Sequence, residues 1–369
     1  MVKYNSENER AKRKYLTFLK EAKRQDESSL DAVTKALSRF EEYGKYRNFK
    51  TFHYQQAVGF KKYLAKQENK QTGKSLSKAT QNSTLRNLKA FFQWLAMQVG
   101  YKSSINYTDA EYFNLSGKDS RIATARREKL VPTIEQIKHV IENMPIITDI
   151  EKRNRALVAF TLLTGMRDSA IASLKLKHVD LIAGSVFQDA RDVKTKNSKT
   201  FTTIFFPVDD EIQEIVEEWV GYLRNELLYG NDEPLFPKTN VIQGEGKVFE
   251  PSGFKKEHWS TASPIRKIFK EAFINAGLQY FNPHSFRNTL VSYGQRLCRS
   301  PEDFKAWSQN LGHEGVLTTF YSYGEVQPQR QAEIIKQLNL PHEKDDMNAA
   351  KIAEALFSKM KALNEGQSL

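Results

Sequence analysis

The sequence predicts a mainly α-helical protein with a small β-sheet (an α+β chain), divided into two or more domains. Apolar residues recur at intervals of three and four along most of the chain, which is the helical period. One pair of segments rich in Thr, Ile and Phe, 185–193 and 200–208, flanks a polar turn and predicts a β-hairpin. The chain has 369 residues, more than the usual domain of about 100–200 residues.

The first third of the chain predicts a compact all-α module. Its helices are expected over residues 7–26, 29–41, 51–67 and 77–101. Ser29 is the expected N-cap of the second helix, because a serine hydroxyl can accept a backbone hydrogen bond there. The second and fourth helices carry clear apolar faces, made of Leu30, Val33, Ala36, Leu37 and Phe40 and of Leu85, Leu88, Phe91, Phe92 and Leu95.

Residues 114–132 break this pattern, with little periodicity and several basic residues, and are interpreted as a basic interdomain linker. Thr133 then begins a new helix as its N-cap, with Gln136 as capping-box partner. Later helices are expected over 211–228, 263–276 and 347–363. The expected division is an N-terminal charged helix (1–28), a helical module (29–113), the linker (114–132), a second domain (133–342) and a C-terminal helix (343–369).

The positive charge is concentrated at the N-terminal end. The whole chain carries 56 Lys and Arg against 44 Asp and Glu, a net charge of +12. Residues 1–129 hold 27 basic and 13 acidic residues, a net charge of +14, so the remainder carries −2. A phosphate backbone is the commonest partner of such a field. The expected backbone contacts are Lys78, Arg86, Lys118, Arg121, Arg126, Arg127 and Lys129.

Several classes of protein are excluded by what the sequence lacks. The single cysteine, Cys298, rules out internal disulfides and cysteine-cluster zinc sites. No apolar run is long enough to span a membrane, and the N-terminus has no signal-peptide pattern. The scattered histidines form no metal-binding pattern, and no nucleotide-binding loop is present. We therefore expect a cytoplasmic protein, nucleoid-associated when bound to DNA, with no cofactor.

Two stretches of the second region place arginines where a phosphate could be gripped. In the first, the break Thr164-Gly165 between two apolar helices is followed by Arg167. In the second, Asn282 is the expected N-cap and Pro283 suits the first helical position, so His284 and Arg287 share one face of the first turn. Free backbone N–H groups in that turn favour an anion.

Two further stretches carry a histidine, tyrosines and lysines. Leu311-Gly312-His313 resembles a helix end closed by glycine, and a short helix from about Thr318 carries Tyr321 and Tyr323. Two positions apart on a helix, only one of these tyrosines can face a given site. The hairpin turn holds Lys194, Lys196 and Lys199.

Over residues 133–325 the sequence resembles the tyrosine recombinase family of the phage-integrase type. The resemblance lies in five motifs that follow in order: TGMR, a hairpin lysine, HSFR, LGH and a tyrosine about ten residues after the LGH histidine. The module at 29–113 is similar to that family's core-binding domain. The segments WSQNLGH and SYGEV resemble the corresponding sequences of integrases of bacterial mobile elements more than those of chromosome-dimer resolvases. The resemblance implies a core-binding domain and a tyrosine-recombinase catalytic domain that form a C-shaped clamp on DNA.

The resemblance also implies a chemistry, in which the enzyme stores the energy of the broken DNA bond as a 3′-phosphotyrosyl link. Arg167 and Arg287 match the two arginines that grip the scissile phosphate. Lys196 matches the lysine that protonates the departing 5′-oxygen. Lys194 and Lys199 are competing assignments for this role and are otherwise expected to contact the DNA. His284, His313 and Tyr323 match the first histidine, the second histidine and the nucleophile.

The sequence departs from the family pattern at two positions. The family usually has an acidic residue three positions after the first arginine, and here that residue is Ala170, while Asp168 lies elsewhere on the turn. The family tyrosine most often lies nine residues after the LGH histidine, and here that residue is Ser322. Tyr321 and Tyr323 flank it, and the SYG text favours Tyr323.

The implied partner is double-stranded DNA at attachment or core sites. The resemblance implies a dimer on one site and a homo-tetramer on two duplexes, and it allows for an accessory DNA-bending protein. A C-terminal helix over 343–369 would contact a neighbouring subunit. Two alternatives stay open: a type IB topoisomerase-like enzyme, and a non-catalytic DNA-binding regulator on the same scaffold. Whether residues 1–28 bind separate arm sites also stays open.

Overall fold

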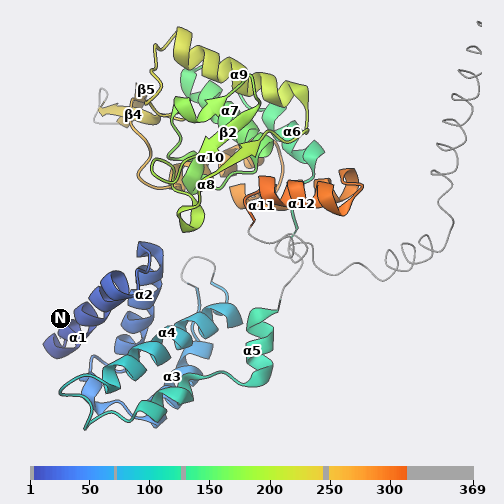
Figure 1. The fold of residues 1–369 in the computed structure, drawn as a ribbon. Coiled ribbons are helices and arrows are strands. Elements are labelled where there is room, and N and C mark those ends of the chain that lie inside the picture. The colour runs from blue at the N-terminus through green and yellow to red at the C-terminus, as the bar shows by residue number, and fades with distance from the viewer. Residues whose placement is uncertain (1–3, 70–72, 126–129, 244–248, 314–369) are drawn as a thin grey trace, which may run out of the picture. The chain divides into compact units, whose positions relative to one another are not determined.

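The computed structural model describes residues 4–69, 73–125, 130–243 and 249–313, which fall into two compact units, Met1–Arg127 and Glu128–Leu369 (Figure 1). The expected helices at 318 and 347–363 lie outside the described residues, as do Tyr321, Tyr323, Arg126, Arg127 and Lys129. None of the helices in the described part of the chain is long and apolar enough to cross a membrane.

The first unit is all-helical, as the sequence predicts. Its main helices are α1 (Ser6–Thr17, continued by a π-helical turn over Phe18–Ala22), α2 (Glu27–Tyr43), α3 (Tyr54–Ala65), α4 (Lys78–Ala96) and α5 (Gly117–Thr124), with 3-10 turns at Phe49–Thr51 and Tyr107–Phe113. Helix α4 contacts each of the other four helices. The apolar faces predicted for α2 and α4 are buried, and Phe92 stacks on Phe52 at 3.8 Å between ring centroids.

One local prediction in this unit is wrong, and one helix was not predicted. Asp26, rather than Ser29, caps α2: its carboxylate accepts a hydrogen bond of 2.8 Å from the Ser29 N–H, so the N-cap lies three residues earlier than expected. Helix α5 was not predicted: it lies within the segment interpreted as the linker, and the Ser116 hydroxyl caps it by accepting a hydrogen bond from the Asp119 N–H. Helix α5 buries no residue, so the sequence has no apolar periodicity to reveal it.

The second unit is built around the buried helix α7. Its helices are α6 (Ile134–Glu142), α7 (Asp149–Thr164), α8 (Asp168–Ile171), α9 (Asp210–Asn225), α10 (Ser263–Asn275), α11 (Pro283–Leu297) and α12 (Pro301–Asn310). Residues 156–164 of α7 are all buried, and α6, α9 and α11 contact it (Figure 1). The expected capping box of Thr133 and Gln136 opens α6.

The β-structure is antiparallel and more extensive than the single hairpin predicted. Strands β1 (Val179–Asp180), β2 (Ser185–Gln188) and β3 (Phe201–Ile204) form a sheet in that order, with Val186 opposite Thr203. The arms of the expected hairpin are therefore shorter, and their connection is longer. A second hairpin, β4 (Lys238–Gln243) with β5 (Phe249–Lys255), was not predicted, because its side chains are mostly exposed and show no alternation.

Candidate active site

Glycine 165 allows the chain to turn sharply from α7 to Arg167. Gly165 has a φ of +58°, and an added Cβ would lie 2.8 Å from both Leu290 and Leu311, so neither the backbone nor the packing leaves room for a side chain. The second apolar helix expected after this break is only the four-residue α8, which begins next to Arg167. Arg167 is half-buried, and burial lowers its pKa.

The guanidinium of Arg287 is buried at the meeting point of two helix ends. It donates hydrogen bonds of 2.5 Å to the carbonyls of Gly165 and Leu311, the C-cap residues of α7 and α12. Helix C-termini carry partial negative charge and so stabilise a cation. Burial lowers the pKa of Arg287 to about 9, and the nearby charge of Arg167 adds to this effect. The Arg287 guanidinium therefore stays protonated at neutral pH. Among the described residues, no carboxylate pairs with either arginine.

His313 lies against this pair of arginines. Its Nε2 is 3.2 Å from Nη2 of Arg287. The preceding Gly312 has a φ of +70°, and a Cβ there would collide with the ring of Phe201 in β3. Burial lowers the pKa of His313 to about 4, helped by the nearby charges of Arg287, Arg167, His284 and Lys199. Three other predicted catalytic residues (Arg167, His284 and Arg287) therefore lie close enough to act on the His313 imidazole, which is neutral at pH 7.

A hollow of about 440 Å³ opens beside Arg167 and His284. The remaining lining residues are Asp168, Arg266, Asn282 and Pro283. Pro283 takes the first position of α11 as expected, whereas the Asn282 side chain makes no capping hydrogen bond. Arg266 belongs to none of the sequence motifs described above, and its Nε donates a hydrogen bond of 2.7 Å to the carboxylate of Asp168. Within the described ranges, no cluster of His, Cys, Asp or Glu could hold a metal ion.

The three hairpin lysines differ in their surroundings. Lys196 is exposed in the 3-10 turn Lys196–Ser198, where Asn197 has a φ of +58°. Lys194 is also exposed. The Nζ of Lys199 lies 5.7 Å from the centroid of the Phe201 ring, and the charge of Lys199 helps to lower the pKa of His313. Of the three, Lys199 is thus the one whose charge contributes to the shifted pKa of His313.

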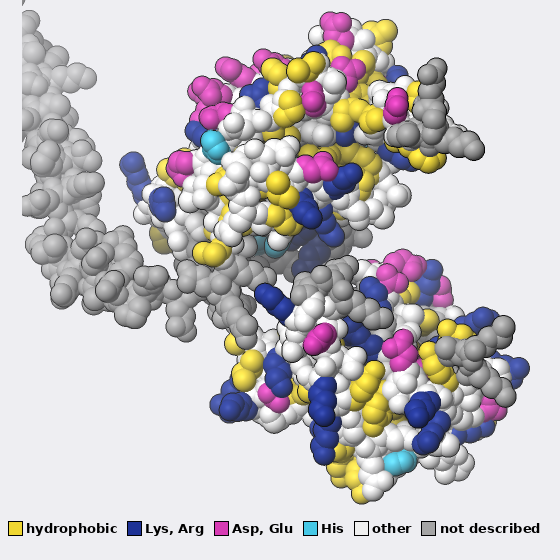
Figure 2. Space-filling model, turned by 180° about the vertical axis from the view of Figure 1, so that it is seen from behind, with side chains coloured by type: hydrophobic (Ala, Val, Ile, Leu, Met, Phe, Trp, Pro, Cys, Tyr) yellow, Lys and Arg dark blue, Asp and Glu magenta, His cyan; other side chains and the backbone are white. Residues whose placement is uncertain are grey.

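Most of the expected DNA-backbone contacts that lie in described parts of the chain are exposed. These are Arg86 on α4 and Lys118 and Arg121 on α5, whereas Lys78 pairs with Asp119 at 3.1 Å. Lys and Arg side chains are spread over the face of the first unit, the lower body in Figure 2. The positive field predicted from the composition is therefore present on the surface of this unit.

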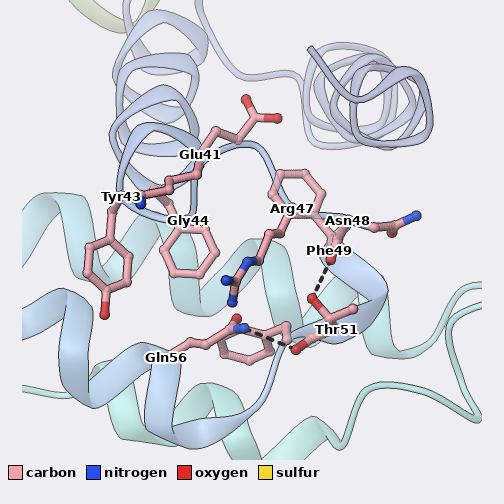
Figure 3. Close-up of a pocket in the computed structure, with 11 residues that line it drawn as sticks. Glu41, Tyr43, Gly44, Arg47, Asn48, Phe49, Thr51 and Gln56 are labelled. Atoms are coloured by element: carbon pink, nitrogen blue, oxygen red, sulfur yellow. Dashed lines mark hydrogen bonds between the residues drawn. The ribbon is translucent and has the colours of Figure 1, made fainter. Parts of the chain in front are cut away.

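A second pocket, of about 220 Å³, lies in the first unit and holds none of the predicted site residues. It is formed by the end of α2, the start of α3 and the segment between them. Figure 3 shows the Arg47 side chain extending into it toward Gln56. Glu41, at its wall, is satisfied by Lys12 and Asn8.

The geometry agrees with what comparison with known proteins shows. Residues 132–330 match the model of the phage integrase family. The chain belongs to the phage integrase family. Membership makes it a tyrosine recombinase, an enzyme that breaks and rejoins DNA.

Individual relatives are distant. The chain is 25% identical to tyrosine recombinase XerC of Lactobacillus delbrueckii subsp. bulgaricus over 260 residues, which are 69% of this chain and 76% of the relative. It is 22% identical to tyrosine recombinase XerD of Oceanobacillus iheyensis over 263 residues, 70% of this chain and 73% of that one.

Two solved structures share the fold. A lambda integrase dimer bound to a core site has a TM-score of 0.58 at 12% identity, over 86% of this chain and 97% of that one. The integrase of transposon Tn1549 in complex with circular intermediate DNA has a TM-score of 0.56 at 14% identity, over 89% and 99%. The mainly α fold with small antiparallel sheets is thus confirmed.

The surroundings of His313 predict an unusual titration. In an NMR titration of the DNA-free protein, the pKa of His313 should be near 4, and Arg167→Gln should raise it toward 6.5 because one nearby cation is removed. Since the folded chain keeps this imidazole neutral, the free energy of unfolding should fall as the pH is lowered from about 6.5 toward 4. Lys267→Gln, which changes an exposed side chain of α10, is the control and should leave the pKa unchanged. A pKa near 6.5 in the wild type would contradict the described geometry.

Proposed function

We propose that this protein is a site-specific DNA recombinase that integrates and excises a mobile element through a 3′-phosphotyrosyl intermediate. The observation that carries the proposal is the pair Arg287 and Arg167, which in the described structure has no carboxylate partner and of which Arg167 lines an open hollow. Guanidinium groups fixed in advance, and not neutralised by the protein, are suited to stabilise the charge on a phosphate in its transition state.

In the proposed reaction, the Tyr323 oxygen attacks the scissile phosphorus while the bond from phosphorus to the 5′-oxygen breaks. Arg167 and Arg287 hold the non-bridging oxygens. His313, neutral and next to Arg287, hydrogen-bonds the phosphate, and His284 acts as an acid, base and positioning group. Lys196 gives its proton to the departing 5′-oxygen. A free 5′-hydroxyl then reverses each step to rejoin a strand, so no external energy source is required.

A phenol with a pKa near 10 is a poor nucleophile at neutral pH. Nearby guanidinium and ammonium groups favour its ionised form, because opposite charges lower the pKa of an acid. The same cations thus serve both the nucleophile and the phosphate.

We also propose a division of labour between the parts of the chain. The helical module at 29–113 and the basic segment 114–132 hold the duplex through its backbone, and residues 133–342 carry out the chemistry. Lambda integrase and the Tn1549 integrase, whose structures contain DNA, share the fold and support this assignment. The expected assemblies stay predictions: a dimer on one site, a tetramer on two duplexes and an accessory DNA-bending protein. The C-shaped clamp and the subunit contact of residues 343–369 also stay predictions.

The first prediction of this proposal concerns the nucleophile. The substrate is a DNA duplex that the purified protein selects from a pool of random sequences. A series of versions of this duplex is prepared, each with a nick at a different position. Cleavage near the nick releases a short fragment that diffuses away, so the strand cannot be rejoined. The wild type should form a covalent protein–DNA adduct, visible on a denaturing gel. Tyr323→Phe should abolish the adduct because the attacking oxygen is removed, whereas Tyr321→Phe should retain it.

The opposite pattern would make Tyr321 the nucleophile. An adduct from neither the wild type nor the variants, on any of the nicked duplexes, would favour the non-catalytic DNA-binding regulator. Relaxation of supercoiled plasmid by the monomer would favour the topoisomerase-like alternative.

The second prediction identifies the lysine that protonates the leaving group. Lys196→Ala should slow adduct formation by about 10²–10⁴-fold, the usual contribution of a general acid. Replacing the bridging 5′-oxygen by sulfur should restore most of the rate, because a thiol of pKa about 8.5 leaves without a proton from the enzyme. Lys194→Ala and Lys199→Ala are the matched controls and should change the rate little on either substrate. Rescue of Lys199→Ala instead of Lys196→Ala would transfer the role to Lys199.

A further inference from the structure

The hollow beside Arg167 contains a basic residue that the proposed chemistry does not use. Three of the side chains that line it, Arg167, Arg266 and His284, are basic, and the carboxylate of Asp168 is the acidic group among them. Its volume, about 440 Å³, lies within the range of ligand pockets, about 300–1,000 Å³, and so exceeds what one phosphate group needs.

The carboxylate of Asp168 is fully engaged within the protein. One of its oxygens accepts the Nε–H of Arg266 at 2.7 Å, and the other accepts the backbone N–H of Ser169 at 2.9 Å. The Asp168 side chain is 20% exposed. Its negative charge is therefore compensated and its orientation fixed, so it does not repel an anion as a free carboxylate would.

Arg266 is held at one end and open at the other. Its Nε is bound to Asp168, its side chain is 59% exposed, and within the described residues its two terminal nitrogens have no hydrogen-bond acceptor. Because a guanidinium is planar, fixing the Nε also fixes the direction of these two groups. A fixed pair of N–H donors is the geometry that binds phosphate oxygens in a bidentate manner.

The ion pair also connects two elements of the site. Arg266 lies in the first turn of α10, and Asp168 is the residue that follows Arg167 and begins α8. The contact spans 98 positions of sequence. It therefore ties α10 to the turn that carries Arg167, and both arginines line the same hollow.

We propose that Arg266 binds a second DNA phosphate, one that neighbours the scissile phosphate, and that Asp168 is the positioning residue that directs it. This inference rests on the proposed function, because it assumes that the scissile phosphate lies at Arg167. The second contact adds affinity and fixes the register of the strand in the hollow, without taking part in bond cleavage.

The test uses the full chain and the nicked duplex on which the wild type forms its adduct, together with a set of duplexes in which one phosphate at a time is a neutral methylphosphonate. Wild-type affinity should fall by about ten- to a hundredfold at one phosphate next to the cleavage position, the usual worth of a hydrogen bond to a charged group. Arg266→Gln should lose the same factor on the unmodified duplex and lose nothing further at that methylphosphonate. Its rate at saturating DNA should stay within a few-fold of the wild type.

Other variants separate phosphate binding from a purely structural ion pair. Arg266→Gln should lower the slope of log affinity against log salt by about one, as the loss of one phosphate contact requires. Asp168→Asn should weaken binding less than Arg266→Gln, and the double variant should still bind more weakly than Asp168→Asn because the phosphate contact of Arg266 is lost. Arg266→Lys, which keeps the charge but not the fork, should recover part of the affinity. Lys267→Gln, its exposed neighbour on α10, is the matched control and should behave as the wild type.

Two results would overturn the inference while leaving the proposed function intact, because the wild type would still form its adduct. In one, the methylphosphonate profile of Arg266→Gln equals that of the wild type. In the other, the double variant binds DNA as tightly as Asp168→Asn, which would mean that Arg266 only neutralises Asp168. Failure of the wild type to form any adduct would instead count against the proposed function.

Discussion

The buried guanidinium of Arg287 is the interaction on which the rest of the site depends. Removing a charge from water is costly unless hydrogen bonds replace its hydration. Here the carbonyls of Gly165 and Leu311 supply those bonds, at the ends of α7 and α12. Because neutral carbonyls satisfy the geometry without cancelling the charge, the positive field stays available to an anion. A carboxylate in the same place would stabilise the fold and consume that field.

The packing around Arg287 explains why glycines flank it. Gly165 and Gly312 both have left-handed backbone, and an added Cβ at either would collide with neighbouring side chains. Close approach at these two points brings α7, β3 and the end of α12 together, so that Arg287 can reach two carbonyls and His313 at once. The site is thus assembled from segments that are far apart in the sequence. The charged side chain of Arg287 links them, and the two glycines allow them to approach closely.

The parts of the structure that sequence reasoning finds are those with a buried face or an ordered set of motifs. The apolar stripes of α2 and α4 are visible because burial imposes the helical period, and Arg167, His284, Arg287 and His313 are found because their motifs follow in order. Helix α5 and the β4–β5 hairpin are missed since both are mainly exposed. Arg266 is missed because its partner, Asp168, is brought to it only by the fold.

The central claim is that the arginine pair is held ready for a phosphate, and urea unfolding in phosphate and in chloride at matched ionic strength tests it most directly. A ligand that binds the folded state raises the free energy of unfolding in proportion to ln(1 + [L]/Kd). General effects of phosphate on protein stability act equally on the wild type and on Arg167→Gln and cancel in the comparison. The account predicts a larger, concentration-dependent stabilisation of the wild type. Equal stabilisation of both proteins would contradict it.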